Sequence, residues 1–265
     1  MLEVIAGADA QDATCSAAPV PGYRAACARD VKGLVIGIAE EMGGDDVDAG
    51  VSAAVATAIA DLEAAGATVK RISLPHTRYA LPTYYLLATA EASSNLARFD
   101  GVRYGMREGD EEALQNMYEK TRGAGFGPEV KTRIMLGTFA LRAGYYDAYY
   151  KKAQQVRTLI ARDFRKAFAE VDVIASPTAP TTAFAFGAKK TPIDMYKADI
   201  FTLSCNLAGL PGLSMNCGFD ESGMPIGLQL LAAPMQEETL LRFAAEYQRH
   251  TDWHTRRPSF GGQPS

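Results

Sequence analysis

The stretch from Tyr196 to Leu231 constrains the fold more than any other part of the chain, because a helix, a sharp corner and two short strands are predicted in immediate succession. Apolar residues recur at helical spacing up to Leu207, where a run rich in glycine and proline ends the helix. Two apolar segments follow, joined by a turn of the Asp-Glu-Ser-Gly type. The corner, the two strands and the turn between them are expected at residues 206–212, 213–217, 226–231 and 220–223.

Asp199 is the unusual residue within this stretch. On the expected helix it shares a face with Tyr196 and Leu203, and such a face packs inward. A carboxylate that is removed from water without a partner is costly. We therefore expect Asp199 to face inward and to bind a partner.

The rest of the chain predicts an α/β fold. A strand, a helix and a second strand come first and indicate a parallel crossover unit. Further helices and one more buried strand follow, so we expect a mixed central sheet covered by helices on both faces. The early strands and helix are expected at 34–38, 68–74 and 48–65; the later helices at 82–103, 130–141, 145–168 and 237–248; and the later strand at 171–175.

Composition divides the chain into three parts. Residues 1–30 are rich in Ala, Pro, Gly and Asp and form an expected irregular lead-in. Residues 31–255 carry the periodic segments and form the expected α/β domain, and residues 256–265 form an expected frayed tail. With 265 residues and 48% hydrophobic content, the chain is long enough to bury a core.

Charge and cysteine usage exclude several function classes. The formal net charge of −4 argues against a nucleic acid or an anionic membrane as the main partner. No apolar run approaches a bilayer-spanning length, and the first residues lack the pattern of a secretory signal. The four cysteines have no metal-binding spacing, so we expect free thiols and a cytoplasmic protein.

Arg133 interrupts an apolar helical stripe, as Asp199 does. One interpretation is a buried ion pair between these two residues, without any ligand. The other is that they bind the two charged ends of an amino acid. An arginine suits a carboxylate because its guanidinium forms a bidentate fork. The residues alone leave both interpretations open, at about equal weight.

His250 and His254 form the one spacing that suggests a metal. They are four residues apart and would share a helix face, as zinc ligands do. No third ligand lies nearby and the segment is at a helix end, so we expect a solvated surface and no metal site.

Five runs resemble one known family. The first is NLAGLPGLS with GMPIGLQLL, and the others occur throughout the chain from about Val4 to about Trp253. Together they are similar to the C-terminal half of the amidase-signature enzymes, and most of all to the A subunits of tRNA-dependent glutamine amidotransferases. The other runs are PTYY from Pro82, EASSNLARFDGVRYG from Glu91, LGTFALRAGYYDAYYKKAQQVR from Leu136 and SPTAPTTAF from Ser176.

The resemblance implies part of an amidase-signature fold and three substrate-binding residues. In enzymes of this kind a Tyr, an Arg and an Asp hold glutamine. By motif these positions fall on Tyr84, Arg133 and Asp199, although Tyr85 is adjacent to the first of them. For the amidotransferases, the implied activity is release of ammonia from glutamine, which serves to amidate Glu-tRNA(Gln) or Asp-tRNA(Asn).

The family's catalytic groups have no counterpart in this chain. Amidase-signature enzymes use two serines within a Gly/Ser-rich run and a lysine base, and an acyl-transfer site needs a nucleophile with a base in reach. Ser93 and Ser94 lie in a helical pattern without flanking glycines, and Lys189 and Lys190 lie in a loop-like stretch. We expect no catalytic residue here. The first residues, MLEVIAG, resemble the tail of a helix whose beginning is absent, which fits a chain that starts after the nucleophile half has ended.

The resemblance also implies partners and alternatives. The partners would be the B and C subunits, together with the missing N-terminal half of the same polypeptide. ATP and Mg²⁺ would be used by the B subunit, no cofactor would bind this chain, and tRNA would be contacted only indirectly. A free-standing amidase of the same family, or a non-catalytic module that binds an amino acid or a partner, remains open. The isolated chain is expected to be inactive.

Overall fold

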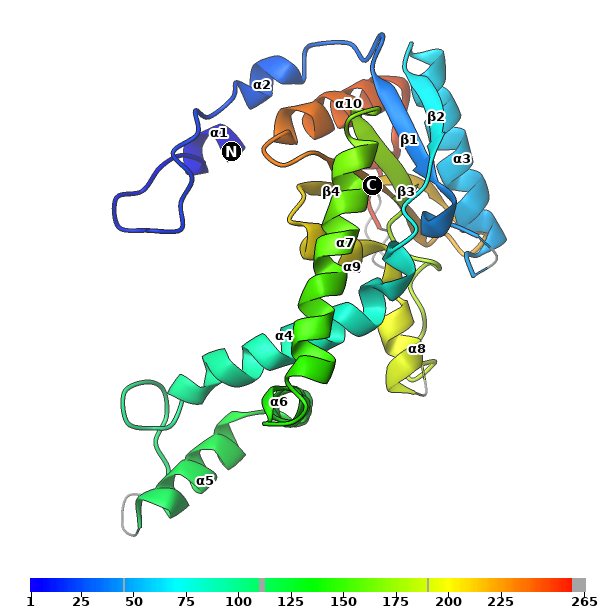
Figure 1. The fold of residues 1–265 in the computed structure, drawn as a ribbon. Coiled ribbons are helices and arrows are strands. Elements are labelled where there is room, and N and C mark those ends of the chain that lie inside the picture. The colour runs from blue at the N-terminus through cyan, green and yellow to red at the C-terminus, as the bar shows by residue number, and fades with distance from the viewer. Residues whose placement is uncertain (45, 110–112, 190, 259–265) are drawn as a thin grey trace. The chain divides into compact units, whose positions relative to one another are not determined.

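The computed structural model describes residues 1–44, 46–109, 113–189 and 191–258. The chain divides into two compact units (Figure 1). Unit 1 comprises Met1–Arg78 and Ile160–Ser265, and unit 2 comprises Tyr79–Leu159. The sequence predicts no such division, because the segments of unit 2 have the same helical periodicity as the rest of the chain.

Unit 1 is built on a five-stranded mixed sheet with the order β2-β1-β3-β5-β4. β1 pairs in parallel with both β2 and β3, whereas β5 pairs antiparallel with β3 and β4. The predicted mixed α/β sheet is therefore confirmed. Its strands are β1 (Val35–Ala39), β2 (Thr68–Ile72), β3 (Val173–Pro177), β4 (Gly212–Phe219) and β5 (Pro225–Ala232).

The predicted parallel crossover is also confirmed. β1 leads into α3 (Ala49–Ala64), which begins where the Asp48 carboxylate accepts a hydrogen bond from the Gly50 N–H at 2.8 Å. Val51, Val55 and other apolar residues of α3 are buried. The chain then returns as β2, in register with β1.

Helices cover the two faces of this sheet. α3 packs against β3, β4 and β5, together with α10 (Glu237–His250). On β5 successive side chains point to opposite faces. The buried Gln229 amide donates to the Phe201 carbonyl of α9 (Ile200–Ala208) at 2.9 Å, so α9 lies over one face, while the alternate residues Leu228 and Leu230 face the other.

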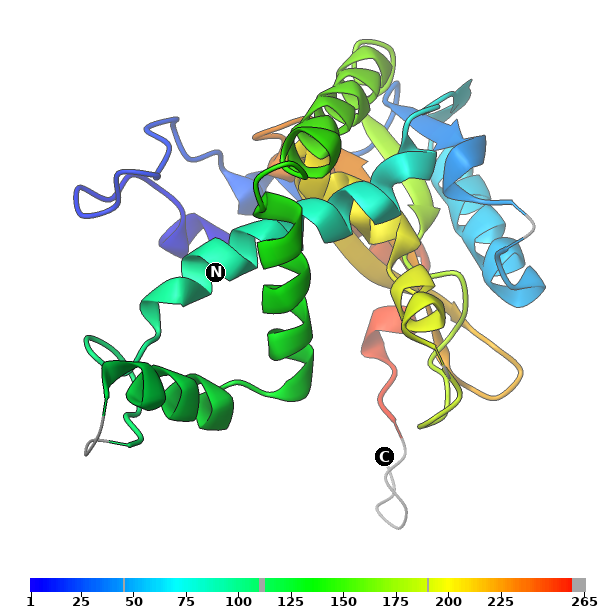
Figure 2. The same cartoon turned by 60° about the horizontal axis from the view of Figure 1, so that its bottom comes forward.

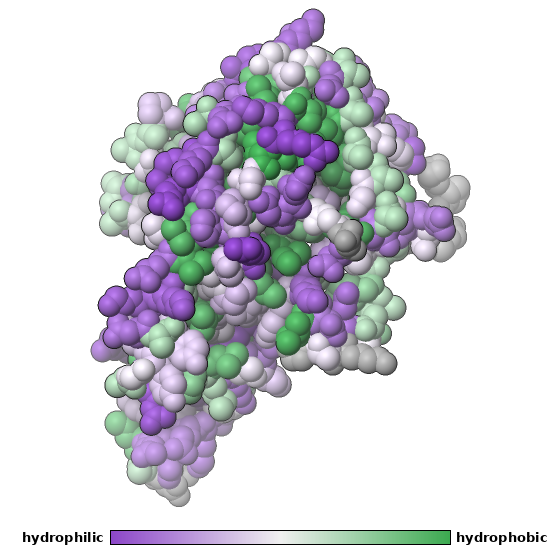
Figure 3. Space-filling view, turned by 45° about the vertical axis from the view of Figure 1, so that its right-hand side comes forward, coloured by the Kyte–Doolittle hydropathy of each residue, from purple (hydrophilic) through white to green (hydrophobic). Residues whose placement is uncertain are grey.

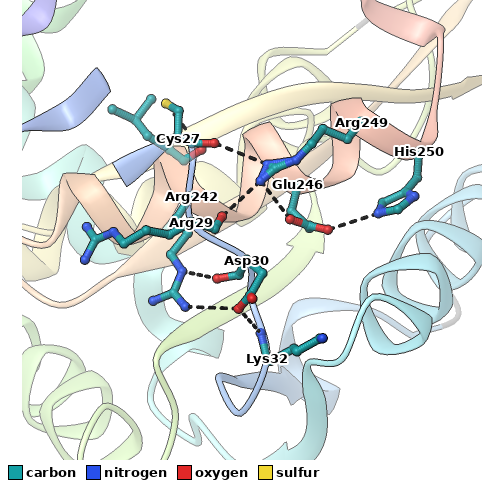
Figure 4. A network of polar contacts seen from close by, with 9 residues as sticks. Cys27, Arg29, Asp30, Lys32, Arg242, Glu246, Arg249 and His250 are labelled. Carbon is teal, nitrogen blue, oxygen red and sulfur yellow. Dashed lines mark hydrogen bonds and ion pairs between the residues drawn. The ribbon is translucent and has the colours of Figure 1, made fainter. Parts of the chain in front are cut away.

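A polar network fastens the N-terminal segment to α10 (Figure 4). Arg249 donates to the backbone carbonyls of Cys27 and Arg29 at 3.2 and 3.0 Å. Glu246 is buried and pairs with both Arg249 and His250, at 2.9 and 3.0 Å. Arg249 thus ties residues 27–29 to α10, and Glu246 balances its charge. The first 30 residues contain only α1 (Leu2–Ile5) and α2 (Tyr23–Ala26).

Unit 2 consists of helices, of which α4 and α6 cross (Figure 2). Several apolar residues of α6 are exposed: Met135, Leu136 and Phe139 are 72%, 49% and 47% exposed. Figure 3 shows hydrophobic surface, in green, at several places among hydrophilic residues. The helices are α4 (Ala80–Asn95), α5 (Leu114–Gly125) and α6 (Pro128–Leu141), and α7 (Lys152–Ala167) spans the boundary between the units.

Several predicted boundaries are wrong. The helix expected at 82–103 ends at Asn95, because a short 3₁₀ turn and Gly101, which has a φ of +83°, follow it. The helix expected from residue 145 begins with a π-helical turn at Asp147–Lys151 before α7. Residues 259–265 of the expected tail lie outside the described residues. No helix in the described part of the chain is long and apolar enough to cross a bilayer.

Candidate functional site

Two adjacent tyrosines project from the first turns of α4. Tyr84 and Tyr85 are both half-buried, and their rings meet edge to face with centroids 5.3 Å apart. Such T-shaped pairs are favourable because the positive ring edge meets the negative ring face. α4 therefore holds the two phenol rings in a defined mutual orientation.

Arg133 lies on α6, the helix that crosses α4. Its side chain is 34% exposed and its Nε–H donates to Glu129 Oε1 at 2.8 Å, one helical turn earlier. The Arg133 guanidinium carbon lies 5.8 Å from the centroid of the Tyr85 ring. Unit 2 thus brings Arg133 together with the tyrosine pair. Glu129 is not among the residues predicted from the sequence, although its spacing of four residues from Arg133 is the signal of a helical ion pair.

Asp199 lies in unit 1 and is exposed, so the expectation of an inward-facing carboxylate is wrong. The expectation assumed one continuous helix from Tyr196 onward. The structure instead has two helices, α8 (Pro192–Lys197) and α9, with Asp199 at the N-cap between them. The face shared with Leu203 therefore does not continue back to Tyr196.

The Asp199 backbone, and not its carboxylate, caps α9. Its carbonyl accepts the N–H groups of Thr202 and Leu203 at 3.0 and 3.2 Å, and the side chain makes no capping bond. Aspartate at this position normally uses its carboxylate for the cap. Among the described residues the Asp199 carboxylate has no hydrogen bond, and the interpretation as a buried ion pair does not fit an exposed side chain.

A hollow of about 310 Å³ in unit 1 adjoins this position. It is lined by residues on either side of Asp199 and by Pro180 and Thr181 of the run SPTAPTTAF. The same run is tied to the β4–β5 turn, where the Thr182 hydroxyl donates to Asp220 at 2.6 Å. This bond is the main reason that the pKa of the Asp220 carboxyl lies below its usual value, with further bonds from backbone N–H groups of the turn.

The two histidines do not share a helix face. α10 ends at His250, and His254 lies in a separate 3₁₀ turn, Trp253–Thr255. His250 instead contacts Glu246 in the network of Figure 4. No group of three His, Cys, Asp or Glu side chains suited to a metal ion occurs among the described residues.

These arrangements have a definite chemical capability. Unit 2 presents an oriented guanidinium beside two phenol rings, and unit 1 presents an exposed carboxylate. A guanidinium binds carboxylates, and a carboxylate binds ammonium groups. Each of these charged groups can therefore bind a ligand group of the opposite charge.

Comparison with known proteins identifies relatives of this chain. The chain is 60% identical over 259 residues to the glutamyl-tRNA(Gln) amidotransferase A subunit of Roseiflexus sp. (strain RS-1), covering 97% of this chain and 53% of that protein. It is 56% identical over 261 residues to the protein of that name from Microcystis aeruginosa, covering 98% and 54%. The chain thus spans about half the length of these relatives.

Solved structures show the same fold. The glutamyl-tRNA(Gln) amidotransferase A subunit of Thermotoga maritima matches with a TM-score of 0.72 and 35% identity, over 94% of this chain and 49% of that one. A bacterial aryl acylamidase of the amidase-signature family matches with a TM-score of 0.73 at 17% identity, over 96% and 51%, which supports the fold alone. A family model described as amidase matches residues 1–241, and the chain therefore belongs to the amidase family.

Proposed function

We propose that this chain forms the substrate-binding part of the subunit that releases ammonia from glutamine in a tRNA-dependent amidotransferase. The observation that carries the proposal is the 60% identity over 259 residues to a relative named as the A subunit of glutamyl-tRNA(Gln) amidotransferase. The charged side chains described above support it, because glutamine carries a carboxylate and an ammonium group at one end.

Three residues bind glutamine in this proposal. Arg133 holds the α-carboxylate, Asp199 accepts hydrogen bonds from the α-ammonium group, and Tyr84 supplies a third contact. Two observations support these roles: the Arg133 guanidinium is oriented by its neighbours, and the Asp199 carboxylate is exposed and unused by the helix that it begins.

The chemical step needs groups from outside this chain. We assign no catalytic residue here, since the sequence contains no Gly/Ser-rich run with a serine nucleophile. The nucleophile, the second serine and the lysine base belong to the N-terminal half of the subunit, which is one of the proposed partners. Glutamine is hydrolysed through an acyl-enzyme, and the released ammonia passes to the B subunit.

The other partners complete the reaction. The B subunit uses ATP and Mg²⁺ to amidate Glu-tRNA(Gln) or Asp-tRNA(Asn), and the C subunit clamps the assembly. tRNA contacts this chain only indirectly, in keeping with its net charge of −4, and the protein acts in the cytoplasm without a membrane.

The experiment is tRNA amidation by the complete amidotransferase with either glutamine or ammonium chloride as nitrogen donor. We expect Arg133→Ala to abolish most glutamine-dependent amidation and to leave ammonium-dependent amidation unchanged, because free ammonia bypasses the glutamine site. Loss of both activities would make Arg133 a structural residue. Hydrolysis of other amides without any tRNA amidation would favour a free-standing amidase.

A further inference from the structure

We propose that Tyr85, the neighbour of Tyr84 on α4, is a positioning residue: its ring holds the Arg133 guanidinium in the orientation that a substrate carboxylate needs. The proposal rests on the proposed function, because it assigns roles within the same glutamine site. The resemblance assigns the substrate contact to Tyr84 and gives Tyr85 no role, whereas in the structure the Tyr85 ring meets Arg133.

The Tyr85 ring is occupied by Arg133. The guanidinium carbon is 5.8 Å from the ring centroid, within the range of a cation–π interaction. Glu129 also holds this group, by accepting a hydrogen bond from the Arg133 Nε–H at 2.8 Å. A planar guanidinium that is held by a ring and by a carboxylate has a restricted orientation, and a bidentate carboxylate ligand requires such an orientation.

Tyr84 points elsewhere. Consecutive residues on an α-helix are about 100° apart around its axis, so Tyr84 and Tyr85 do not present the same face. Tyr84 contacts the Tyr85 ring edge to face, with an interplanar angle of 86°. Within the described residues the Tyr84 hydroxyl has no hydrogen bond. A half-buried phenol hydroxyl normally has a partner, and a ligand atom would supply it.

The crossing of α4 and α6 explains why Tyr85 and Arg133 meet. Gly137 of α6 lies against the backbone of Thr89 of α4. Arg133 precedes Gly137 by one helical turn, and Tyr85 precedes Thr89 by one turn. The Thr89 hydroxyl also donates to the Tyr85 carbonyl. The contact between the Tyr85 ring and the Arg133 guanidinium thus lies one helical turn from the close contact of Gly137 with Thr89.

One turn further along, a second bond fixes the same crossing. The hydroxyls of Ser93 on α4 and Thr138 on α6 lie 3.1 Å apart. Ser93, which lies in a helical pattern without flanking glycines, therefore has a structural partner. Both contacts hold the rotation of α4 against α6, and this rotation decides which tyrosine faces Arg133.

The test uses matched variants of the complete amidotransferase, with ammonia release from glutamine as the readout. Tyr84→Phe removes only a hydroxyl and should lower kcat/KM about tenfold, since one hydrogen bond to the ligand is lost. Tyr85→Phe keeps the ring and should raise KM less than Tyr85→Leu does, so the two variants together isolate the contribution of the ring. Tyr85→Leu removes the ring and should raise KM about tenfold with kcat nearly unchanged.

A double-mutant cycle shows whether Tyr85 acts through Arg133. Arg133→Ala combined with Tyr85→Leu should be no worse than Arg133→Ala alone, because the ring has nothing left to position. Additive losses would overturn the positioning role. Equal KM values for Tyr85→Phe and Tyr85→Leu would also overturn it, because the ring would then contribute nothing.

The outcomes separate this proposal from the proposed function. If Arg133→Ala leaves glutamine hydrolysis unchanged, the proposed glutamine site itself is wrong. If Arg133→Ala is harmful and Tyr85→Leu is not, only the positioning role fails. Ammonium-dependent amidation, measured for each variant, shows that the assembly is folded.

Discussion

Gly137 of α6 lies directly against the carbonyl oxygen of Thr89 of α4. A Cβ atom on this glycine would overlap that oxygen and would stand 2.7 Å from the Cβ of Ser93. Backbone and side chain of α4 together leave no room for any residue larger than glycine. The two helices that carry the tyrosine pair and Arg133 therefore pack this closely only because residue 137 is a glycine.

We expect Gly137→Ala to destabilise the protein, by about 1–3 kcal/mol, because a methyl group forced into a packed contact displaces the neighbouring backbone. Thermal or denaturant unfolding measures the effect. The matched control is Gly123→Ala on α5, whose Cβ would meet no atom within 4 Å. This control should gain about 0.5–1 kcal/mol, because alanine is favoured over glycine inside helices. Equal effects of the two changes would contradict the packing account.

The Cys217 thiol provides a prediction on pH. Burial raises the pKa of Cys217 to about 12, with a backbone hydrogen bond opposing the shift. At pH 8 only on the order of one molecule in ten thousand carries the thiolate, so Cys217 should react with a thiol reagent only after unfolding. A Cys217→Ala variant should therefore lose one reactive thiol in denaturant and none in the native state.

The same shift predicts how stability changes with pH. The unfolded thiol ionises near pH 8.5, whereas the folded thiol remains neutral up to about pH 12. The neutral form is thus favoured by folding, and its contribution is present below the unfolded pKa and lost as the pH rises toward 12. Between these values the wild type should lose stability faster than Cys217→Ala, by about 1.4 kcal/mol per pH unit at most. Parallel curves for the two proteins would contradict the shift.

The isolated chain should release no ammonia from glutamine. It carries residues suited to binding the substrate and lacks the serine–serine–lysine set that forms an acyl-enzyme. A coupled glutaminase assay on the purified chain measures this, with an identically purified blank. Activity above the blank that a single substitution in this chain abolishes would show that a nucleophile is present after all.

The isolated chain should also self-associate. Met135 and Phe139 are exposed on α6, and β4 is the last strand of the sheet that the described residues form. Exposed apolar surface and an unpaired strand edge both favour association. Size-exclusion chromatography and binding of a hydrophobic dye measure it, and Met135→Glu should reduce both signals. A monomer that binds no dye would contradict this prediction.

The sequence predicts the features that depend on residues close together in the chain, and it does not predict contacts between separate helices. The crossover of β1, α3 and β2 follows from local periodicity, and so does the β4–β5 hairpin, because its turn residues are specific. Local periodicity likewise predicts that Tyr84 and Arg133 each lie on a helix. By contrast, the contact of Arg133 with Tyr85 depends on the rotation of α4 against α6, which no local pattern encodes.

The exposure of Asp199 is a second feature that local sequence patterns do not predict. The apolar residues around Asp199 have helical spacing, but the helix is interrupted between α8 and α9. One break of this kind changes which face every later residue occupies. The sequence therefore does not predict the exposure of the Asp199 side chain, and its role in binding stays a prediction.

The most direct test of the account compares glutamine with its analogue that lacks the α-amino group, in the complete amidotransferase. Asp199→Asn and Arg133→Ala should each lower kcat/KM for glutamine by about thirty- to a thousand-fold, since a charge-assisted contact of roughly 2–4 kcal/mol is lost. With the analogue, Asp199→Asn should lose most of its penalty, because the ammonium group that it no longer binds is absent. Arg133→Ala should still penalise both substrates. Equal penalties of Asp199→Asn on both substrates, together with a lowered melting temperature, would show that Asp199 stabilises the fold and does not bind the amino acid.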